Sequence, residues 1–540
     1  MQLSAYNSSL AFRLPSPAAR EESSAAQMDL PFLALSGGDS YNGVVEGTNE
    51  RQNPFIVVPK DLLTRAKTPN QVVQDLSRLN VPVNAEIPLI NGYTVVMNED
   101  ERRRVEQAGY QVMPDLSDKF LLPSPWERKP EENVETIATE PATPTTPRAT
   151  LTEPRYASPL TQQFTGRGVG IAIIDTGIYP HPDFNFPHSR IVAFQDFVNG
   201  STLAYDDNGH GTHTAGDAAG NGFLSEGLYR GAAPEANLVG IKVLDKNGNG
   251  TTSNILKGIN WAVENKEQYN IRVINLSLGS SQRWAHRRQD PIQQAVEKAV
   301  DAGIVVVVSA GNEGPYPGTI SAPGDNPRVI TVGALDDRNT PDPSDDRIPS
   351  FSSRGKSDTM KPDLVAPGEG IIGPNAPGTI SEATARKYGA VQKTLSWLDR
   401  MRDEELVHVP EDTLRLIGLN PSSIQRFKNS PQTARSEINR LIETTNRLPM
   451  VSSNYLGMPG TSMAAPIVAG VVAQVLEANP HLSPDEVKQV LRQSATQLPG
   501  YGREAQGSGA VNPDRAIELA LQKLDEGDRN GQLHLPLEQL

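Results

Sequence analysis

The chain has 540 residues, of which 37% are hydrophobic and 21% charged, an ordinary composition for a globular protein of a few domains. Its formal net charge of −14 argues against nucleic acid or an anionic membrane as the main partner, because both attract basic surfaces. The absence of cysteine excludes disulfides, thiolate metal sites and cysteine nucleophiles.

The N-terminal segment predicts neither a folded domain nor a targeting signal. Residues 1–52 are rich in Ser, Ala, Glu and Gly without periodicity, which predicts disorder. The first residues lack a continuous apolar core after a basic start, so they do not predict a secretory signal. No run of about twenty apolar residues predicts a membrane-spanning helix. We therefore expect a cytoplasmic protein, with export by another route as the alternative.

A small α/β domain is predicted over residues 53–122. Its first helix is marked by Thr68 as the N-cap and Pro69 at the first helical position, and its second helix ends at Gly109. Extended runs surround these helices at 55–59, 81–87, 92–97 and 110–114. The resulting order, βαββαβ, is typical of a ferredoxin-like unit. The segment 123–160 that follows is proline-rich, polar and poor in apolar residues, which predicts a linker.

The chain after the linker predicts a parallel sheet covered by helices. Short runs rich in β-branched residues recur at 168–175, 238–244, 272–278, 304–311 and 329–335. They are almost continuously apolar, as expected of strands that are buried on both faces. Helical patterns alternate with them, and this alternation indicates an α/β fold with a mostly parallel sheet between helices. Two further helices are expected at 462–479 and 484–496.

Four polar residues are expected at the carboxyl ends of these strands or at helix starts, where chemistry gathers in such sheets. Asp175 closes the first strand, Asn312 follows the fourth, His210 begins a helix in NGHGTHTAG, and Ser462 begins one in GTSMAAPIVAG. These residue types suit acyl transfer, because a serine hydroxyl needs an imidazole to take its proton and a carboxylate orients the imidazole. A carboxamide such as that of Asn312 can stabilise the oxyanion.

Each of these residues also has a simpler explanation. Asp175 could cap a helix, and Asp-Thr-Gly is also the aspartic-protease motif, but that chemistry needs a second such loop, which the sequence lacks. His210 and His213 could ligate zinc, but no glutamate follows as in His-Glu-x-x-His and no third ligand is evident. Alone, Asn312 would be a polar turn and Ser462 an ordinary helix residue. Their combination favours catalysis.

Five blocks carry a family resemblance: IAIIDTGIYPHPDF, NGHGTHTAG, INLSLGS, SAGNEGP and GTSMAAPIVAG. They resemble the blocks of subtilisin-like serine proteases, in that family's order; subtilisin is itself a standard example of this triad order and of an oxyanion asparagine. The resemblance implies a subtilisin-like three-layer α/β fold, with Asp175, His210 and Ser462 as catalytic residues and Asn312 as the oxyanion donor. Details such as KPDLVAPG are similar to the bacterial intracellular alkaline serine proteases.

The resemblance also implies roles for the rest of the chain. Residues 161–523 are identified as the catalytic domain and 53–122 as a propeptide that assists folding and then occupies the substrate cleft, with an unrelated accessory domain as the alternative. The walls of the primary substrate pocket are expected at Ser277, Leu278, Gly279, Ser309, Ala310 and Gly311. These uncharged walls predict a preference for bulky apolar or aromatic side chains. Protein or peptide substrates and the chain's own propeptide are the expected partners of a monomer.

Two segments depart from the family pattern, residues 376–448 and the loop at 220–236. Residues 376–448 lie where the family has a short connection, and their apolar spacing predicts an inserted helical subdomain; packing decoration is favoured over a role in substrate access or partner binding. Residues 524–540 predict a polar tail.

No cofactor is expected to be required. Many relatives bind structural calcium, but the loop at 220–236 lacks the usual calcium-loop residues, and the acidic run 336–347 is better explained as a solvated loop.

Two functions are compatible with this pattern. The first is an endopeptidase that hydrolyses peptide bonds through an acyl-enzyme and processes its own precursor. The second is a catalytically silent scaffold that keeps the fold to bind peptides. An inactive relative is expected to lack a triad member, and the four roles are all filled here, which favours the enzyme.

Overall fold

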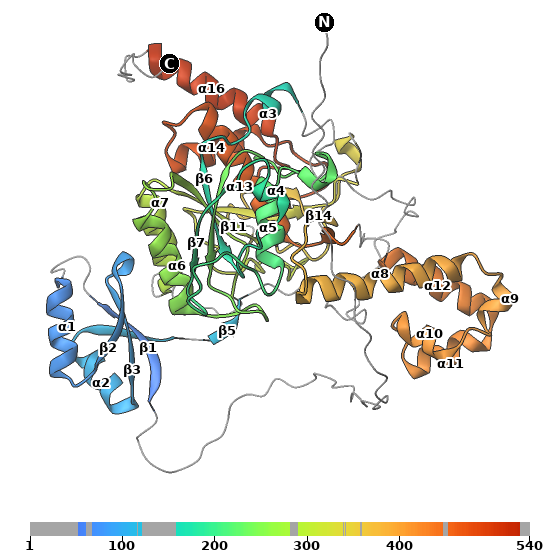
Figure 1. Cartoon of the computed structure of the whole chain (residues 1–540), viewed down its shortest axis with the longest axis horizontal. Coiled ribbons are helices and arrows are strands. Elements are labelled where there is room, and N and C mark those ends of the chain that lie inside the picture. The colour runs from blue at the N-terminus through green and yellow to red at the C-terminus, as the bar shows by residue number, and fades with distance from the viewer. Residues whose placement is uncertain are drawn as a thin grey trace, which may run out of the picture. The chain divides into compact units, whose positions relative to one another are not determined.

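The computed structural model describes residues 52–60, 67–115, 117–120, 158–280, 290–338, 340, 342–356, 359–445 and 452–529 (Figure 1). The described residues all lie within one compact unit of the chain, residues 49–540. Residues 1–51 of the predicted N-terminal segment and residues 121–157 around the predicted linker lie outside the described part of the chain.

The small domain has the element order expected from the sequence. Its elements are β1 (Asn53–Pro59), α1 (Pro69–Arg78), β2 (Val83–Ile87), β3 (Gly92–Met97), α2 (Glu99–Gln107) and β4 (Tyr110–Pro114). The strands form an antiparallel sheet in the order β2-β3-β1-β4. Both helices start with a capping box, formed by Thr68 with Gln71 and by Asn98 with Glu101, in which side chains satisfy the first free amides. A short additional strand, β5 (Ser117–Lys119), follows.

The central sheet of the large domain has seven parallel strands in the order β13-β12-β11-β10-β6-β8-β7. Their bounds are β6 (Gly170–Asp175), β7 (Ile191–Asp196), β8 (Asn237–Lys242), β10 (Ile271–Leu276), β11 (Val305–Ser309), β12 (Ile330–Leu335) and β13 (Leu364–Pro367). The expected α/β fold with a parallel sheet is confirmed. The chain adds β7 and β8 on one side of β6 and then β10 to β13 on the other. The carboxyl ends of β6 and β10 therefore border the crevice where such sheets bind ligands.

Successive residues of the central strands alternate between two hydrophobic clusters. In β6, Ile171 and Ile173 belong to the cluster that includes α5 (His210–Ala219) and α13 (Thr461–Ala478). Ala172 and Ile174 belong instead to the cluster that includes α6 (Thr252–Glu264) and α7 (Pro291–Asp301). Figure 1 shows these two helix pairs on opposite sides of the sheet. Burial on both faces explains why the strands read as continuous apolar runs.

Two further long helices, α14 (Pro484–Ser494) and α16 (Pro513–Arg529), pack on the α13 side of the sheet. The helix α16 continues past residue 524, where the sequence predicts a polar tail. Within the described ranges, α13 is the one helix long and apolar enough to cross a membrane, and 94% of it is buried inside the protein.

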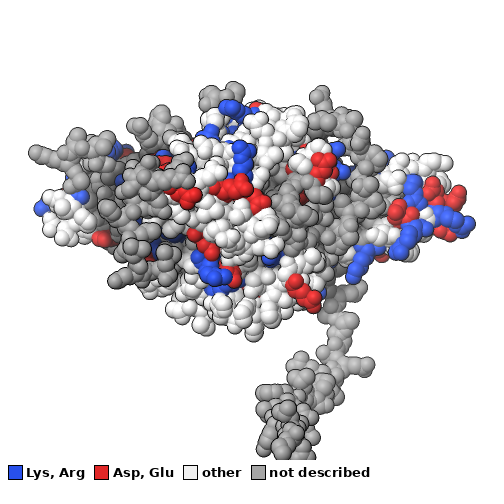
Figure 2. All heavy atoms as spheres, turned by 90° about the horizontal axis from the view of Figure 1, so that it is seen from above, with Lys and Arg blue, Asp and Glu red and all other residues white. Residues whose placement is uncertain are grey.

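The inserted segment is helical, as expected, and has its own core. It contains α8 (Ile380–Asp399), α9 (Asp403–Leu406), α10 (Glu411–Leu416), α11 (Pro421–Asn429) and α12 (Pro431–Thr445). Buried side chains such as Leu398, Phe427 and Ile438 form a cluster separate from those of the sheet. Figure 2 shows basic and acidic side chains intermixed over this part of the surface, in agreement with ion pairs such as that of Arg435 with Asp403 (2.7 Å).

The insertion leaves and rejoins the large domain at adjacent points. The strands β14 (Ile371–Pro374) and β15 (Tyr455–Met458), which flank it, pair antiparallel. The amide of Asn375 donates a hydrogen bond to the carbonyl of Asn454 (2.8 Å). The insertion is thus a loop extension whose ends meet, and β15 leads directly to α13.

Candidate active site

Asp175 and His210 meet where the end of β6 faces the start of α5. Nδ1 of His210 lies 2.8 Å from Oδ1 and 3.1 Å from Oδ2 of Asp175. Asp175 is fully buried and His210 is 8% exposed. The helix can approach the strand this closely because residue 211 is glycine: a Cβ atom there would lie 2.1 Å from the carbonyl oxygen of Gly177. The Gly-His-Gly sequence thus permits the contact between imidazole and carboxylate.

The surroundings of His210 favour its protonated form. Burial lowers the pKa of the imidazole, but the charge and the hydrogen bond of Asp175, together with the charges of Asp206 and Asp217, outweigh burial and raise the pKa above its usual value of 6.5. With Nδ1 held by the carboxylate, the tautomer that carries its proton on Nδ1 leaves Nε2 as an acceptor. An imidazole held in this way can take a proton and be stabilised as a cation.

Ser462 is the second residue of α13 and is 3% exposed. The helix follows Gly460, whose φ of 143° is rarely adopted by L side chains. Oγ of Ser462 donates to the carbonyl of Ser277 (3.3 Å), and Oγ of Ser277 donates to the carbonyl of Ser462 (2.7 Å). Among the described residues no hydrogen bond joins Ser462 to His210, although α5 and α13 pack against each other. Such catalytic contacts are often long without substrate and tighten when it binds.

Asn312 follows β11 and is fixed by the start of α13. Its Oδ1 accepts hydrogen bonds from the amide (2.9 Å) and the hydroxyl (3.0 Å) of Thr461. A Cβ atom at Gly460 would lie 3.4 Å from Nδ2 of Asn312. The carboxamide is therefore oriented with its donor group beside Gly460, two residues from Ser462. A donor in this position can stabilise negative charge on an oxygen attached to the acylated carbon.

The six predicted wall residues lie at the carboxyl ends of β10 and β11, which are neighbours in the sheet, and Ser309 is the last residue of β11. The hydroxyl of Ser277 donates a hydrogen bond to the carbonyl of Ser462. Leu278 is buried in the hydrophobic cluster that includes α6. The amide of Gly279 donates to the carbonyl of Phe120, the last described residue of the small domain (2.9 Å). The amide of Gly311 donates to the hydroxyl of Thr461 (3.1 Å). The role of these residues as pocket walls stays a prediction.

His213 has a structural environment that differs from that of His210. Its Nδ1 lies 2.9 Å from Oδ2 of Asp217, and its Nε2 lies 3.1 Å from the carbonyl of Leu456 in β15. The side chain is completely buried. Nδ1 therefore makes a contact within α5 and Nε2 joins α5 to β15, and the arrangement does not resemble a zinc site.

Sequence reasoning missed two residues that organise the site, Thr461 and Asp206. Thr461 orients Asn312, and Asp206 accepts hydrogen bonds from the loop that precedes His210. The sequence shows Asp206 beside Asp207 before NGHG, but it does not show which of the two carboxylates faces inward. Asp206 is 6% exposed, whereas the side chain of Asp207 is 36% exposed and pairs with Lys242 (2.7 Å).

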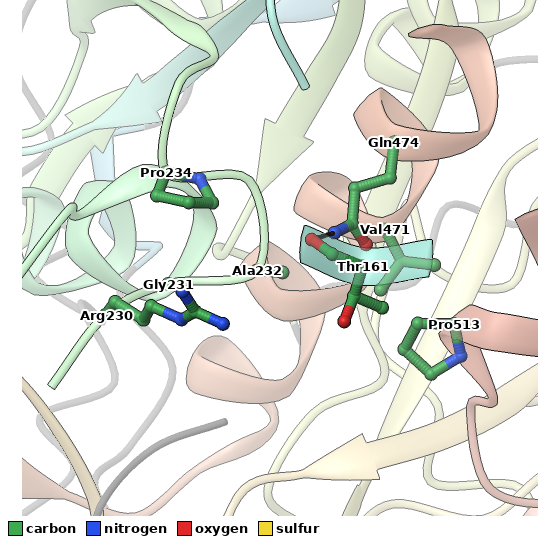
Figure 3. A pocket seen from close by; sticks show the side chains of 8 residues that line it. All are labelled: Thr161, Arg230, Gly231, Ala232, Pro234, Val471, Gln474 and Pro513. Atoms are coloured by element: carbon green, nitrogen blue, oxygen red, sulfur yellow. Dashed lines mark hydrogen bonds between the residues drawn. The ribbon is translucent and has the colours of Figure 1, made fainter. Parts of the chain in front are cut away.

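A small pocket lies at the other end of α13, away from Ser462. Figure 3 shows it between Thr161, Arg230, Pro513 and residues of α13 that include Val471 and Gln474. Gln474 follows Ser462 by twelve positions, which is about 18 Å along a helix. Its Nε2 donates to the carbonyls of Thr161 (3.4 Å) and Phe164 (2.8 Å). The pocket therefore lies beside the first described residues of the large domain and not at the candidate active site.

The described carboxylates do not gather as calcium ligands near the loop that follows α5. No group of three or more His, Cys, Asp or Glu side chains that could hold a metal ion occurs in the described ranges. Asp183 reaches this loop, but its oxygens accept hydrogen bonds from the hydroxyl of Tyr455 (2.8 and 2.9 Å) and the amide of Leu224 (3.2 Å). The residues present there do not fit a cation. The expectation that no cofactor is required stays a prediction.

Comparison with known proteins gives consistent results. Residues 166–511 match the subtilase family. The chain is 40% identical over 377 residues to Serine protease AprX of Bacillus subtilis (strain 168), covering 68% of this chain and 71% of that protein. It is 31% identical over 353 residues to Subtilisin Savinase of Lederbergia lenta, covering 65% of this chain and 91% of that protein.

One solved structure has a similar fold over most of the chain. Fervidolysin from Fervidobacterium pennivorans, described as a keratinolytic enzyme related to subtilisin, is similar with a TM-score of 0.56 at 21% identity. The similarity covers 87% of this chain and 61% of that one. At this level of identity it supports the fold alone.

Proposed function

The chain belongs to the subtilase family of serine endopeptidases, and on that premise we propose that Ser462 is its nucleophile, His210 its general base and Asp175 the carboxylate that orients the base. The observation that carries the proposal is the 2.8 Å contact between Nδ1 of His210 and Asp175, on a helix that packs against α13, whose second residue is Ser462. Asn312 is the oxyanion donor.

The reaction proceeds in two acyl-transfer steps. Oγ of Ser462 attacks the carbonyl carbon of the substrate peptide bond while Nε2 of His210 takes its proton. The carbonyl oxygen becomes negatively charged and receives a hydrogen bond from Nδ2 of Asn312. The imidazolium, stabilised by Asp175, then gives its proton to the leaving amine. A water molecule attacks the acyl-enzyme by the same route and regenerates Ser462.

The small domain acts as the propeptide of the same chain. Its strand β5 pairs antiparallel with β9 (Asn249–Thr251) of the large domain, and Phe120 accepts a hydrogen bond from Gly279. The ring of Phe120 is buried in the same cluster as Leu244 and Leu278. The segment of β5 and Phe120 is thus extended and contacts both β9 and Gly279 of the large domain. Many proteases and peptide-binding domains bind a peptide in this way, as an added strand. Gly279 lies two residues after Ser277, whose carbonyl accepts a hydrogen bond from Ser462, so Phe120 is held beside the residues that contact the proposed nucleophile.

The body of the small domain is anchored separately. The amide of Leu89 donates to Oδ1 of Asn260 on α6 (2.9 Å). Oδ1 of Asp115 accepts from the amide of Ser253 in the first turn of α6 (2.9 Å). Ile56 and Met113 pack in the cluster that contains α6 and α7. These contacts tether the segment after Phe120 as an intramolecular substrate, so the first cleavage should be fast and independent of protein concentration.

Processing should remove residues up to a point before Ser158. Ser158 is the N-cap of α3 (Pro159–Gln163) and forms a capping box with Thr161. Its side chain also contacts Asp514. The carbonyl of Phe164 is held by Gln474. Since a protease needs an extended, accessible chain, cleavage within this anchored helix would require local unfolding.

Expression of wild type and Ser462→Ala in a protease-deficient host tests this function. We expect wild type to cleave peptides and to give a fragment whose N-terminus lies between residues 121 and 158, as read by N-terminal sequencing. Ser462→Ala should remain near the full 58.4 kDa, and Ser189→Ala, at an exposed loop serine, should behave as wild type. Trimming of Ser462→Ala at the same bond contradicts self-processing. Wild type that cleaves peptides at full length contradicts the propeptide role, and lack of Ser462-dependent cleavage supports the silent scaffold.

Three finer expectations accompany this function. Substrates are proteins or peptides, cleaved after bulky apolar or aromatic side chains. The cytoplasmic location stays a prediction, and appearance of the protein in culture supernatant without lysis contradicts it. The monomeric state also stays a prediction, which the molar mass in solution tests.

A further inference from the structure

Asp206 is a buried carboxylate at the start of the helix that carries His210. Its Oδ1 accepts hydrogen bonds from the amides of Asn208 (3.0 Å) and Gly209 (2.9 Å). Its Oδ2 accepts from the amide (2.9 Å) and the hydroxyl (2.7 Å) of Thr212. These donors precede and follow His210 in sequence. Asp206 therefore caps α5 around the histidine, in the region where the helix dipole favours negative charge.

The same carboxylate is joined to the residue that follows Asp175. The hydroxyl of Thr176 donates to Oδ1 of Asp206 (3.0 Å) and accepts from the amide of Gly211 (2.9 Å). The amide of Thr176 donates to Oδ1 of Asp175 (2.7 Å). A continuous chain of hydrogen bonds thus runs from the Asp175 carboxylate through Thr176 to Asp206 and the helix of His210.

The nearby cation does not neutralise Asp206. Nζ of Lys242 is completely buried and donates to the carbonyls of Thr176 (2.6 Å) and Leu244 (2.8 Å) and to Oδ1 of Asp207 (2.7 Å). Its ion pair is made with Asp207, whereas the side chain of Asp206 accepts hydrogen bonds from backbone amides and from the hydroxyls of Thr176 and Thr212. The charge of Asp206 therefore remains available to act on neighbouring groups.

We propose that Asp206 is a positioning residue of the reaction: it fixes His210 against Asp175 through Thr176, and its charge stabilises the imidazolium that forms at His210. This inference rests on the proposed function of His210 as the general base. It assigns to Asp206 a role that the four-residue pattern of the site does not include.

The two effects of Asp206 can be separated by substitution. Asp206→Asn keeps one acceptor oxygen but removes the charge. Thr176→Val keeps the charge of Asp206 but removes the hydroxyl that joins it to the strand. Asp196→Asn is the matched control, because Asp196 is also buried and accepts from the amides of Val198 (2.8 Å) and Asn199 (2.9 Å) without a contact to His210.

The pH dependence of kcat/KM on a small peptide substrate is the readout. The charged groups around His210 are Asp175, Asp206, Asp217 and the Lys242–Asp207 pair. Because His210 must be neutral to accept a proton, activity rises with pH through its pKa, and the negative charge of Asp206 helps to raise that pKa. Asp206→Asn should therefore move the acid limb of the profile, the rise of kcat/KM at low pH, to lower pH, because a neighbouring negative charge that raises the pKa of His210 is removed.

The rates complete the test. Asp206→Asn and Thr176→Val should each lose roughly ten- to a hundredfold in kcat, because a misplaced catalytic group has costs of that size. Thr176→Val should have the same acid limb in its pH profile as wild type. Asp196→Asn should have the same acid limb and the same kcat as wild type. An unshifted limb in Asp206→Asn, or an equal shift in Asp196→Asn, overturns the proposal while wild-type activity stands. If wild type shows no Ser462-dependent activity, it is the proposed function that fails.

Discussion

Thr461 donates two hydrogen bonds, from its amide and from its hydroxyl, to the same oxygen of Asn312 (2.9 and 3.0 Å). The contact joins the residue before the proposed nucleophile to the proposed oxyanion donor. It also distinguishes the two ends of the carboxamide, because the end that accepts these two bonds is the oxygen and the other end is therefore the nitrogen. The first turn of α13 therefore fixes the position of Asn312, the proposed oxyanion donor, relative to Ser462.

Replacement of Asn312 should slow catalysis much more than it weakens binding. We expect Asn312→Ala to lower kcat by about 10²–10³-fold with little change in KM, since the lost donor acts on charge that develops in the transition state. Thr461→Ala is a graded control, because it loses the hydroxyl bond but keeps the amide bond to Asn312. Steady-state kinetics on one peptide should rank the rates wild type, Thr461→Ala, Asn312→Ala. Unchanged kcat in Asn312→Ala removes it from the mechanism.

Much of the fold could be predicted because local signals agreed with the tertiary structure. Asp290 followed by Pro291 marks the start of α7, and Thr68 followed by Pro69 marks that of α1, as the capping interactions show. The five predicted strands of the large domain were found, with ends shifted by at most two residues. Their sequences predict strands because helices cover both faces of the sheet.

Other elements left no such signal. The strand β7 has only one fully buried position, Asp196, so it lacks an apolar run. The strand β13 is four residues long, and β5 has three residues that form a strand only by pairing with β9. Asp206 could not be found from spacing, since its proposed role depends on a hydrogen bond from Thr176, which directly follows β6 and lies thirty residues earlier. Motifs predicted the positions of the proposed triad, whereas the residues that contact these positions were found only in the structure.

A buried lysine should make stability depend on pH in an identifiable way. Lys361 donates to Thr331 (2.6 Å) and Asp363 (2.7 Å), and Lys488 lies 3.1 Å from the same carboxylate. Burial lowers the pKa of Lys361 to about 7; Asp363 opposes this shift and Lys488 adds to it. Between about pH 7 and the usual pKa of 10.5, the unfolded chain binds a proton here that the folded protein does not. This group therefore makes the free energy of unfolding rise with pH in that window.

Lys361→Met removes this contribution and provides the comparison. Both proteins should carry Ser462→Ala, which prevents autolysis, and their free energies of unfolding should be measured in urea at several pH values. The free energy of unfolding of the protein with Lys361, minus that of Lys361→Met, should increase with pH by at most about 1.4 kcal/mol per pH unit. A difference between the two proteins that is flat or falls over this range contradicts the assignment.

The predicted pocket walls lead to a test of substrate preference. Ser277–Gly279 and Ser309–Gly311 carry no charged side chain, so the pocket offers no partner for a basic substrate residue. We expect a peptide panel that varies only the residue before the cut bond to show higher kcat/KM for Phe, Tyr and Leu than for Lys and Arg. Cleavage confined to peptides with Lys or Arg at this position contradicts the prediction.

The central claim is that Ser462 is a nucleophile activated by His210, and labelling with a serine-directed fluorophosphonate tests it most directly. Peptide mapping of the processed wild-type protein should find the label on Ser462 alone. The label should be absent from Ser462→Ala and should form far more slowly in His210→Ala, in which the general base is missing. Labelling elsewhere, no labelling of folded wild type, or equal rates in wild type and His210→Ala would contradict the account.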